Sequence, residues 1–388
     1  MGELETVLAK AGCKVDAATG AVTAPIHLAT TFERDTDLHF SRGYVYGRVK
    51  NPTRDMFEQA MAAAEGGTEA AAVSSGVTAA TLVFQAALGG RGAHVLFPDD
   101  VYHGNRVVLR SVLEPWGMGC TEVDMTDGAA VGEHAARHKD ASTLVVWVET
   151  PSNPMAKVSD IRRICEVVRH NCPQSVVVVD ATFATPCLMQ PLALGADLVV
   201  HSLTKYIGGH SDLTGGVVVC GHTDNGKKLF TRCRELQWVL GMVLGPQDCW
   251  LAMRGLRSLS ARMKVHCYNA KKVAEFLNKH PNVERVYHCA LPEHPGHDIA
   301  RATMKDFGAT FSFCVKGGRD DAVGVVARLK LFIRATSLGG TESLAEHRAS
   351  IEAQPTRTPE NLIRLHVGLE NPDDLIHDLD QALTRSKL

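Results

Sequence analysis

The run Ser175-Val176-Val177-Val178-Val179-Asp180 decides the fold class of this chain of 388 residues. Its β-branched residues favour a strand, and because successive side chains of a strand point to opposite faces, both faces must be buried. Strands of this kind occur mainly in parallel sheets covered by helices on both sides. Similar runs occupy His94–Phe97, Leu144–Glu149, Ala196–Val200 and Gly216–Cys220, and helical segments such as Ile161–His170 separate several of them. We therefore expect βαβ units and an α/β fold with a mostly parallel sheet.

The chain on either side of this region has a different pattern. Residues 1–50 lack periodicity, which predicts an N-terminal arm that packs against another surface, often another subunit. From Gln247 to about Lys279 apolar residues recur at helical spacing, which predicts a long linker helix. Beyond it, Thr310–Val315 and Leu362–Val367 alternate like half-exposed antiparallel strands. We predict an arm over residues 1–50, an α/β domain over 51–245 and a smaller α+β domain over 246–388.

Two helix starts are predicted from their capping residues. Thr53 is expected to cap a helix that runs through Met56 to Ala64. Asn371 is expected to cap the last helix, with Pro372 at its first position.

Composition excludes several classes of function. The apolar fraction of 45% and the net charge of -2 are typical of a globular protein without an electrostatic footprint for nucleic acid or anionic membrane. No apolar run approaches 18 residues, and the segment from Met1 to Glu5 does not resemble a signal peptide. The eleven cysteines lack paired CxxC spacing and the histidines are dispersed. We expect a cytoplasmic protein with reduced thiols and no metal site.

Polar residues lie at or just beyond the ends of several predicted strands. They are Tyr102, Glu149, Asn153, Asp180 and Lys205. Ligands of open α/β sheets gather at the carboxyl ends of the strands. This shared placement predicts a binding site.

The hexapeptide His201-Ser202-Leu203-Thr204-Lys205-Tyr206 follows one of these strands. Lysine is rarely buried without a partner, and one use for such an amine is to form a Schiff base. Ser202 and Thr204 can then bond a phosphate on the same cofactor, and pyridoxal 5'-phosphate (PLP) meets both demands. From the hexapeptide alone, a surface loop with a solvated lysine explains the pattern equally well.

Asp180 meets a second requirement of PLP. A carboxylate after four consecutive valines is costly to bury unless it is paired. A protonated pyridine nitrogen would pair with it and keep the ring an electron sink. Tyr102 can stack on the ring face. The alternative is a structural aspartate that caps the next turn.

Two stretches can bind the phosphate. Ser75-Gly76-Val77 joins a short strand to an Ala-rich helix, where Gly76 and Val77 offer free backbone N–H groups. Arg48 and Tyr46 precede another predicted helix and can add a guanidinium and a hydroxyl. The alternative for Arg48 and Tyr46 is ordinary solvation in a loop.

Together these residues resemble the γ-family of fold-type I PLP-dependent enzymes, which contains cystathionine γ-synthase, cystathionine γ-lyase, cystathionine β-lyase and methionine γ-lyase. The resemblance extends from about Thr23 to Ala382. It rests on Tyr46-Gly47-Arg48 with Asn51-Pro52-Thr53, Ser75-Gly76-Val77, Glu149-Thr150-Pro151-Ser152-Asn153-Pro154, Val179-Asp180-Ala181-Thr182-Phe183, Pro191-Leu192-Ala193-Leu194-Gly195-Ala196-Asp197, the Lys205 hexapeptide, Ser337-Leu338-Gly339-Gly340 and Arg364-Leu365-His366-Val367-Gly368-Leu369-Glu370.

The resemblance implies a homotetramer made of two active dimers, with a large α/β domain and a smaller C-terminal domain. Arg364 would bind the substrate α-carboxylate with help from Ser337 and Asn153, and a neighbouring subunit would supply Tyr46 and Arg48. The implied cofactor-binding set is Tyr46, Arg48, Gly76, Val77, Tyr102, Asp180, Ser202, Thr204 and Lys205.

Departures from the family pattern gather where the distal end of the substrate is expected. Thr336 stands where the synthases and γ-lyases for cystathionine usually carry glutamate. His366 replaces a common serine, Ser350-Ile351-Glu352-Ala353 replaces a Met-Thr-His segment, and the role of Arg106 is open.

These residues predict a PLP-dependent transsulfuration enzyme that cleaves or forms C–S bonds in cystathionine or a related homoserine-derived amino acid. Lys205 would remove the Cα proton and Tyr102 would protonate the departing sulfur, which makes both catalytic. Methionine γ-lyase and cystathionine β-lyase are the alternatives within the family, and a non-catalytic PLP-fold protein is the alternative outside it. A nicotinamide dehydrogenase is disfavoured because no GxGxxG follows a strand.

Overall fold

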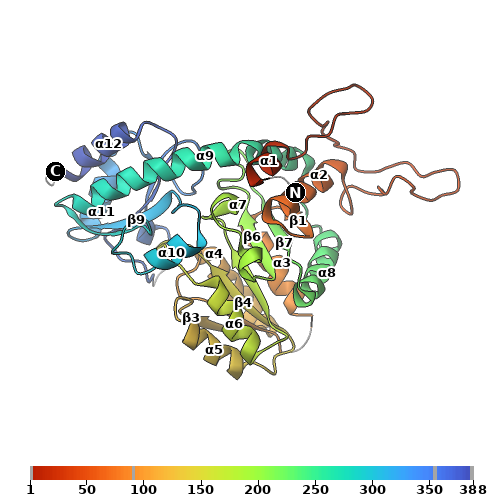
Figure 1. The fold of residues 1–388 in the computed structure, drawn as a ribbon, viewed down its shortest axis with the longest axis horizontal. Coiled ribbons are helices and arrows are strands. Elements are labelled where there is room, and N and C mark those ends of the chain that lie inside the picture. The colour runs from red at the N-terminus through yellow and green to blue at the C-terminus, as the bar shows by residue number, and fades with distance from the viewer. Residues whose placement is uncertain (1–2, 90–91, 353–355, 385–388) are drawn as a thin grey trace.

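The computed structural model describes residues 3–89, 92–352 and 356–384. Its larger layer is a seven-stranded sheet in the order β1-β7-β6-β5-β4-β2-β3 (Figure 1). The strands are β1 (Glu69–Val73), β2 (His94–Pro98), β3 (Gly119–Val123), β4 (Leu144–Glu149), β5 (Val176–Asp180), β6 (Leu198–Ser202) and β7 (Gly216–Cys220). Strand β7 pairs antiparallel with both β1 and β6, and the other pairings are parallel. The prediction of a mostly parallel sheet is confirmed.

Helices cover both faces of this sheet, as the valine run of β5 requires. Val177 and Val179 join the core beneath α2, α5 and α6, whereas Val176 and Val178 join the core beneath α3 and α8. Burial of each such side chain is worth about 1.5–3 kcal/mol, so neither face could remain in water. The helices of this part of the chain are α2 (Pro52–Glu65), α3 (Gly76–Ala87), α4 (His103–Val107), α5 (Gly128–Arg137), α6 (Ile161–Asn171), α7 (Thr185–Leu188) and α8 (Asp224–Val239).

The second layer is a five-stranded sheet in the order β10-β11-β12-β9-β8. The long helix α9 (Pro246–Lys279) runs along the molecule from the N-terminal elements to this sheet (Figure 1). The other elements here are β8 (Val283–Tyr287), α10 (His297–Thr303), β9 (Thr310–Val315), α11 (Arg319–Arg328), β10 (Ile333–Arg334), β11 (Leu344–His347), β12 (Leu362–His366) and α12 (Pro372–Thr384). Within the described ranges, the structure contains no helix long and apolar enough to cross a membrane.

The predicted half-exposure of β9 and β12 is wrong, because every residue of both strands is buried. The alternation itself is real: Phe311, Phe313 and Ile363 belong to the apolar core. The intervening polar side chains face the large domain instead of water. Ser312 Oγ donates to the carbonyl of Pro154 at 2.8 Å, for example.

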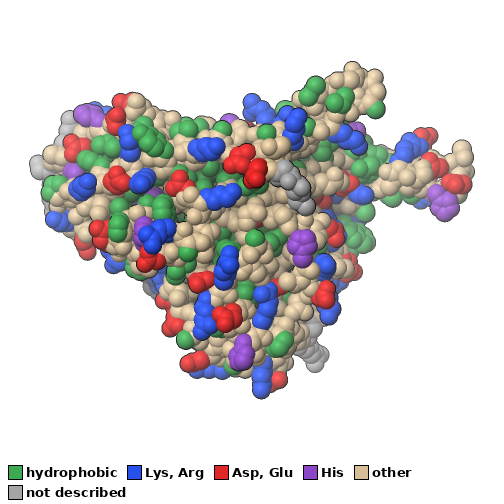
Figure 2. All heavy atoms as spheres, in the orientation of Figure 1, with side chains coloured by type: hydrophobic (Ala, Val, Ile, Leu, Met, Phe, Trp, Pro, Cys, Tyr) green, Lys and Arg blue, Asp and Glu red, His purple; other side chains and the backbone are tan. Residues whose placement is uncertain are grey.

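The N-terminal segment begins with α1 (Leu4–Ala9), which contacts α9 and α2. The chain between α1 and α2 then projects from the body of the molecule, in red and orange in Figure 1. Several of its apolar side chains are exposed, among them Val22, Leu28 and Leu38. Figure 2 shows the same projection beyond a body on which basic and acidic side chains are interspersed. The three-part division predicted from the sequence stays a prediction.

Of the two predicted helix caps, one is wrong and one is confirmed. The cap of α2 is Asn51, whose Oδ1 accepts from the backbone N–H of Thr53 and Arg54, so Thr53 is not the cap. The hydroxyl of Thr53 instead accepts from the N–H of His27 at 2.9 Å. The prediction for the last helix is confirmed, since Asn371 Oδ1 accepts from the N–H of Asp373 at 2.9 Å.

Strand β6 begins two residues later than predicted because Asp197 anchors the chain before it. Oδ2 of Asp197 accepts from the N–H of Val177 at 2.7 Å, and Oδ1 pairs with Arg169 at 3.1 Å. Strand β3 was not predicted. It is an edge strand and mostly half-buried, so it lacks the continuous apolar run that marks its neighbours.

Candidate active site

A cavity of about 550 Å³ lies beyond the carboxyl ends of β4, β5 and β6 and is closed by residues of the second sheet and its connecting segments. The predicted site residues that line it are Gly76, Val77, Tyr102, Asn153, Asp180, Ser202, Thr204, Lys205, Ser337 and Arg364. These side chains come from distant parts of the chain and meet in one place, as the strand-end placement predicts.

Lys205 lies after β6, and its amine points to the second domain. Nζ donates to the hydroxyl of Ser337 at 2.7 Å. Burial, followed by the nearby positive charge of Arg364, lowers the pKa of Lys205 from 10.5 to about 8. Ser337 itself has a left-handed backbone, with a φ of +84°, which is strained for a residue with a side chain. The arrangement supplies a poorly solvated amine that loses its proton far more easily than a surface lysine.

Asp180 ends β5 with its carboxylate at the cavity. Oδ1 accepts from the N–H of Thr182 at 3.0 Å, and burial raises the pKa of the carboxyl group. Within the described ranges, no basic side chain forms an ion pair with Asp180. A half-buried carboxylate that lines a cavity and lacks a protein cation fits a cationic group on a ligand.

The start of α3 forms the anion cradle predicted from Ser75-Gly76-Val77. Ser75 caps the helix by accepting from the N–H of Thr78 at 3.0 Å, and Gly76 begins it. A Cβ on Gly76 would lie 2.7 Å from Cβ of Ser202, so only glycine allows this close approach. Ser202 thus lies against the start of α3, and Gly76, Val77, Ser202 and Thr204 all line the cavity.

Arg364 lies on β12 with 4% of its surface exposed. Its Nη1 donates to Asn153 Oδ1 at 3.2 Å, and its Nη2 lies 2.7 Å from Glu346 Oε2 and 3.1 Å from the carbonyl of Ser337. Burial lowers the pKa of Arg364 from 12.5 to about 10, so the guanidinium stays charged at neutral pH. It is a fixed fork of the kind that binds carboxylates.

One feature of the cavity was missed from the sequence, an ion-pair network around Arg348. Arg348 lines the cavity, and its Nη1 lies 3.1 Å from Glu346, which thereby joins Arg348 to Arg364. Nε of Arg348 also lies 2.9 Å from Glu352. No motif marked Arg348 or Glu346, because an ion-pair network is visible only once the strand and the turn after it are folded together. Thr336 also lines the cavity, in agreement with its expected place near the substrate.

Tyr46 and Arg48 do not reach the cavity of their own chain. Both lie on the projecting segment, where the guanidinium of Arg48 donates to the carbonyl of Trp238. Arg106 also lies outside, since it donates to the carbonyl of Asp99 and lies 3.7 Å from Glu122.

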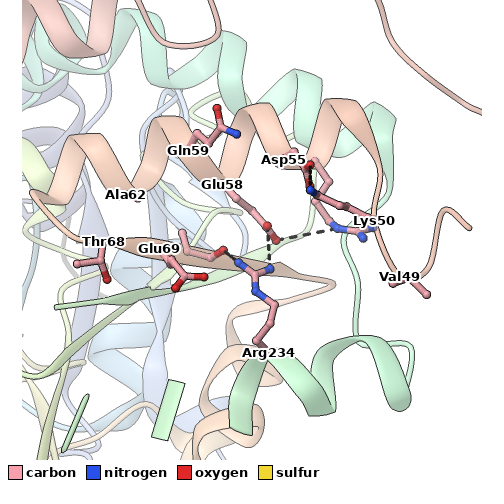
Figure 3. A pocket seen from close by; sticks show the side chains of 11 residues that line it. Val49, Lys50, Asp55, Glu58, Gln59, Ala62, Thr68, Glu69 and Arg234 are labelled. Atoms are coloured by element: carbon pink, nitrogen blue, oxygen red, sulfur yellow. Dashed lines mark hydrogen bonds and ion pairs between the residues drawn. The ribbon is translucent and has the colours of Figure 1, made fainter. Parts of the chain in front are cut away.

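A second cavity, of about 350 Å³, lies between α2, β1 and α8 (Figure 3). Its side chains already satisfy one another: Glu58 pairs with Arg234 at 2.8 Å, and Asp55 pairs with Lys50 at 3.5 Å. It contains none of the predicted site residues. We therefore assign the chemistry to the cavity of about 550 Å³ that contains Lys205.

Comparison with known proteins agrees with this geometry. The model of the family described as Cys/Met metabolism PLP-dependent enzyme matches residues 5–384. The chain belongs to this family. It is 43% identical to the cystathionine gamma-synthase of Mycobacterium tuberculosis over 378 residues, covering 96% of this chain and 95% of that protein. It is 41% identical to the cystathionine beta-lyase of Coxiella burnetii over 390 residues, covering 98% and 97%.

A solved structure confirms the architecture. A methionine gamma lyase from Micromonospora echinospora superposes with a TM-score of 0.88 and 37% identity, covering 99% of both chains. The fold-type I architecture expected from the sequence is thus confirmed, as is the assignment of the chain to the PLP-dependent enzymes that act on C–S bonds.

PLP fits the cavity by the chemistry of its donors. An amine of lowered pKa, a half-buried carboxylate without a protein cation and a helix N-terminus with two hydroxyls correspond to the aldehyde, the ring nitrogen and the phosphate. Tyr102 lines the same cavity, and a Cβ on Gly104 would lie only 2.6 Å from its ring.

Proposed function

We propose that this enzyme cleaves or forms C–S bonds in cystathionine or a related homoserine-derived amino acid, as a transsulfuration enzyme of the cystathionine γ-lyase or γ-synthase type. The observation that carries the proposal is the opposition of Lys205 and Arg364 across one cavity, joined through Ser337. With both residues at one cavity, a single amino acid can bind Arg364 through its carboxylate and place its Cα beside Lys205. The activities of the relatives support the substrate class.

Each residue then has a defined part in the reaction. PLP, when bound, supplies the electron sink that makes the Cα proton acidic. Asp180 binds the ring nitrogen, while Gly76, Val77, Ser202 and Thr204 bind the phosphate. Lys205 holds the cofactor and afterwards carries protons between Cα and Cβ.

The substrate is bound and released by other groups. Arg364, with Asn153 and Ser337, orients its α-carboxylate. Tyr102 delivers a proton to the departing sulfur.

Cystathionine β-lyase and methionine γ-lyase activities are the second candidates, because relatives with those activities resemble the chain about as closely. Thr336, Arg348 and Ile351 line the cavity, and the family pattern places a substrate's distal end near Thr336. Their polar and apolar side chains do not by themselves select one substrate.

Product analysis separates these candidates. The purified enzyme with PLP is incubated with cystathionine, with methionine, and with O-acylhomoserine plus cysteine. We expect cystathionine to give cysteine, 2-oxobutanoate and ammonia, or O-acylhomoserine plus cysteine to give cystathionine. Pyruvate and homocysteine would identify the β-lyase instead. Turnover of methionine alone, to methanethiol and 2-oxobutanoate, would contradict the proposal. Lys205→Ala is the inactive control.

We further propose a homotetramer of active dimers in which the neighbouring subunit supplies Tyr46 and Arg48. The support is that both residues lie away from their own cavity, on a projecting segment with exposed apolar side chains. A cytoplasmic location is proposed because all eleven cysteines are free, as in reducing compartments.

A further inference from the structure

Glu149 is a buried carboxylate that touches two site residues by their backbones. It ends β4 with 6% of its surface exposed. Oε2 accepts from the N–H of Tyr102 at 2.9 Å, and Oε1 accepts from the N–H of Asn153 at 2.9 Å. One side chain therefore joins the loop after β2 to the loop after β4.

Asp100 makes the reciprocal connection between the same two loops. It belongs to the loop after β2, and its Oδ2 accepts from the N–H of Met155 at 3.1 Å and from the hydroxyl of Ser152. Asp100 thus gives a carboxylate from the loop after β2, and Glu149 gives one from the end of β4. Lys157 and Asp99, which lie on these same two loops, add an ion pair at 2.8 Å.

The connection through Glu149 continues into the rest of the site. Asn153 accepts from Arg364 on the second domain at 3.2 Å. Glu149 also lies beside Asp180 in the register of β4 and β5. Burial, and then the charge of Asp180, raise the pKa of Glu149 well above 4.5, so the fold bears a cost to keep this carboxyl group where it is.

We propose that Glu149 is a positioning residue of the active site, which holds the backbone of Tyr102 so that its ring meets the PLP ring and the backbone of Asn153 so that its amide meets Arg364. The proposal rests on the roles given to Tyr102 and Arg364 in the proposed function.

Replacement by glutamine tests this geometry with little change in volume. A glutamine side chain has one acceptor oxygen and one NH₂ group, and the NH₂ group would oppose a backbone N–H. Glu149→Gln can therefore keep only one of the two hydrogen bonds, and either Tyr102 or Asn153 loses its tether. Displacements of about 1 Å at a reacting site cost about 100-fold in rate.

The experiment compares the holoenzyme with Glu149→Gln and with a control, Asp378→Asn. Asp378 on α12 is also buried and accepts from the backbone N–H of Lys330 and Leu331 at 2.9 and 2.8 Å, away from the cavity. The readouts are the visible circular dichroism of bound PLP per bound cofactor, the Tm, and kcat and KM separately. We expect Glu149→Gln to lower the dichroism at least twofold and kcat by about 10- to 100-fold.

The control should lower the Tm and leave the dichroism and kcat of the folded enzyme unchanged. Wild-type dichroism and kcat in Glu149→Gln would overturn the proposal, as would an equal loss of both in Asp378→Asn. If Glu149→Gln does not fold, Asp100→Asn loosens the same loops from the other side. A several-fold rise in KM with reduced dichroism is then expected, and unchanged values would overturn the proposal. A wild-type protein that binds no PLP would instead overturn the proposed function.

Discussion

Lys205 owes its reactivity to its surroundings more than to its own sequence motif. Burial and then the charge of Arg364 lower its pKa to about 8, and its amine donates to the hydroxyl of Ser337 at 2.7 Å. A hexapeptide cannot encode this, because Ser337 and Arg364 lie on the second domain. The free amine is the form that attacks an aldehyde, so its supply depends on pH.

This pKa predicts how the apoenzyme takes up PLP. Below pH 8 most Lys205 carries a proton and cannot attack, and above pH 8 most of it is free. The rate at which PLP attaches should therefore rise between pH 6.5 and 9, with a midpoint near 8, and then level off. Stopped-flow absorbance on apoenzyme measures it. A midpoint near 10.4, the value of a solvated lysine, would show that the amine is not desolvated.

The sequence predicts the place of site residues that follow strands. It does not predict the place of residues that only contact those strands or their loops. Lys205 and Asp180 come directly after apolar runs, so their placement at a sheet edge could be inferred. The link from Glu346 to Arg364 and Arg348 could not, because no spacing marks a carboxylate shared by two guanidinium groups. The bonds of Glu149 to backbone N–H groups leave no trace in the sequence either.

Among the elements, the bounds of the β-branched strands were the easiest to predict, and the burial of the polar face of the second sheet was the hardest. Strands β4 and β7 lie where their runs predict, because a run that must be buried on both faces has few alternatives. Strands β9 and β12 show the same alternation that a solvated sheet would show, but their polar side chains pack on the loop after β4. Alternating apolar and polar residues therefore do not distinguish a strand face that is exposed to water from one that packs on a polar part of the protein.

The projecting N-terminal segment predicts that two chains share each site. Lys205→Ala and Arg48→Ala are co-expressed with different tags, and the mixed assembly is purified by both tags. If Arg48 serves the partner's cavity, one of the two cavities in a mixed dimer holds both Lys205 and Arg48. We then expect about half of the wild-type activity per dimer, while each variant alone is nearly inactive. The activity is measured at limiting PLP.

A mixed assembly as inactive as the two separate variants would contradict this prediction, because it would place Arg48 outside the neighbouring site. Arg42→Ala, on the same segment but paired with Asp35 at 3.5 Å, is the control that should retain activity without any mixing.

At the scale of the whole molecule, the cavity exists because two sheets meet. The large sheet brings Asp180, Lys205 and the start of α3 together, and the second sheet adds Arg364 and Ser337. Asn153 and Arg364, which touch across this junction, are 211 positions apart in the chain. Local patterns predict each sheet and the helix α9 between them, but the contact between the sheets follows from packing alone. From the sequence, only the family resemblance implied that Asn153 and Arg364 belong to one site.

The most direct test of this site is to find the lysine that carries PLP. The holoenzyme is treated with borohydride, which fixes the cofactor to its lysine, then digested and mapped by mass spectrometry. We expect the pyridoxyl group on the peptide that contains Lys205, and its loss in Lys205→Ala. A label on another lysine, such as Lys157, or a wild-type protein that carries no label, would contradict the assignment.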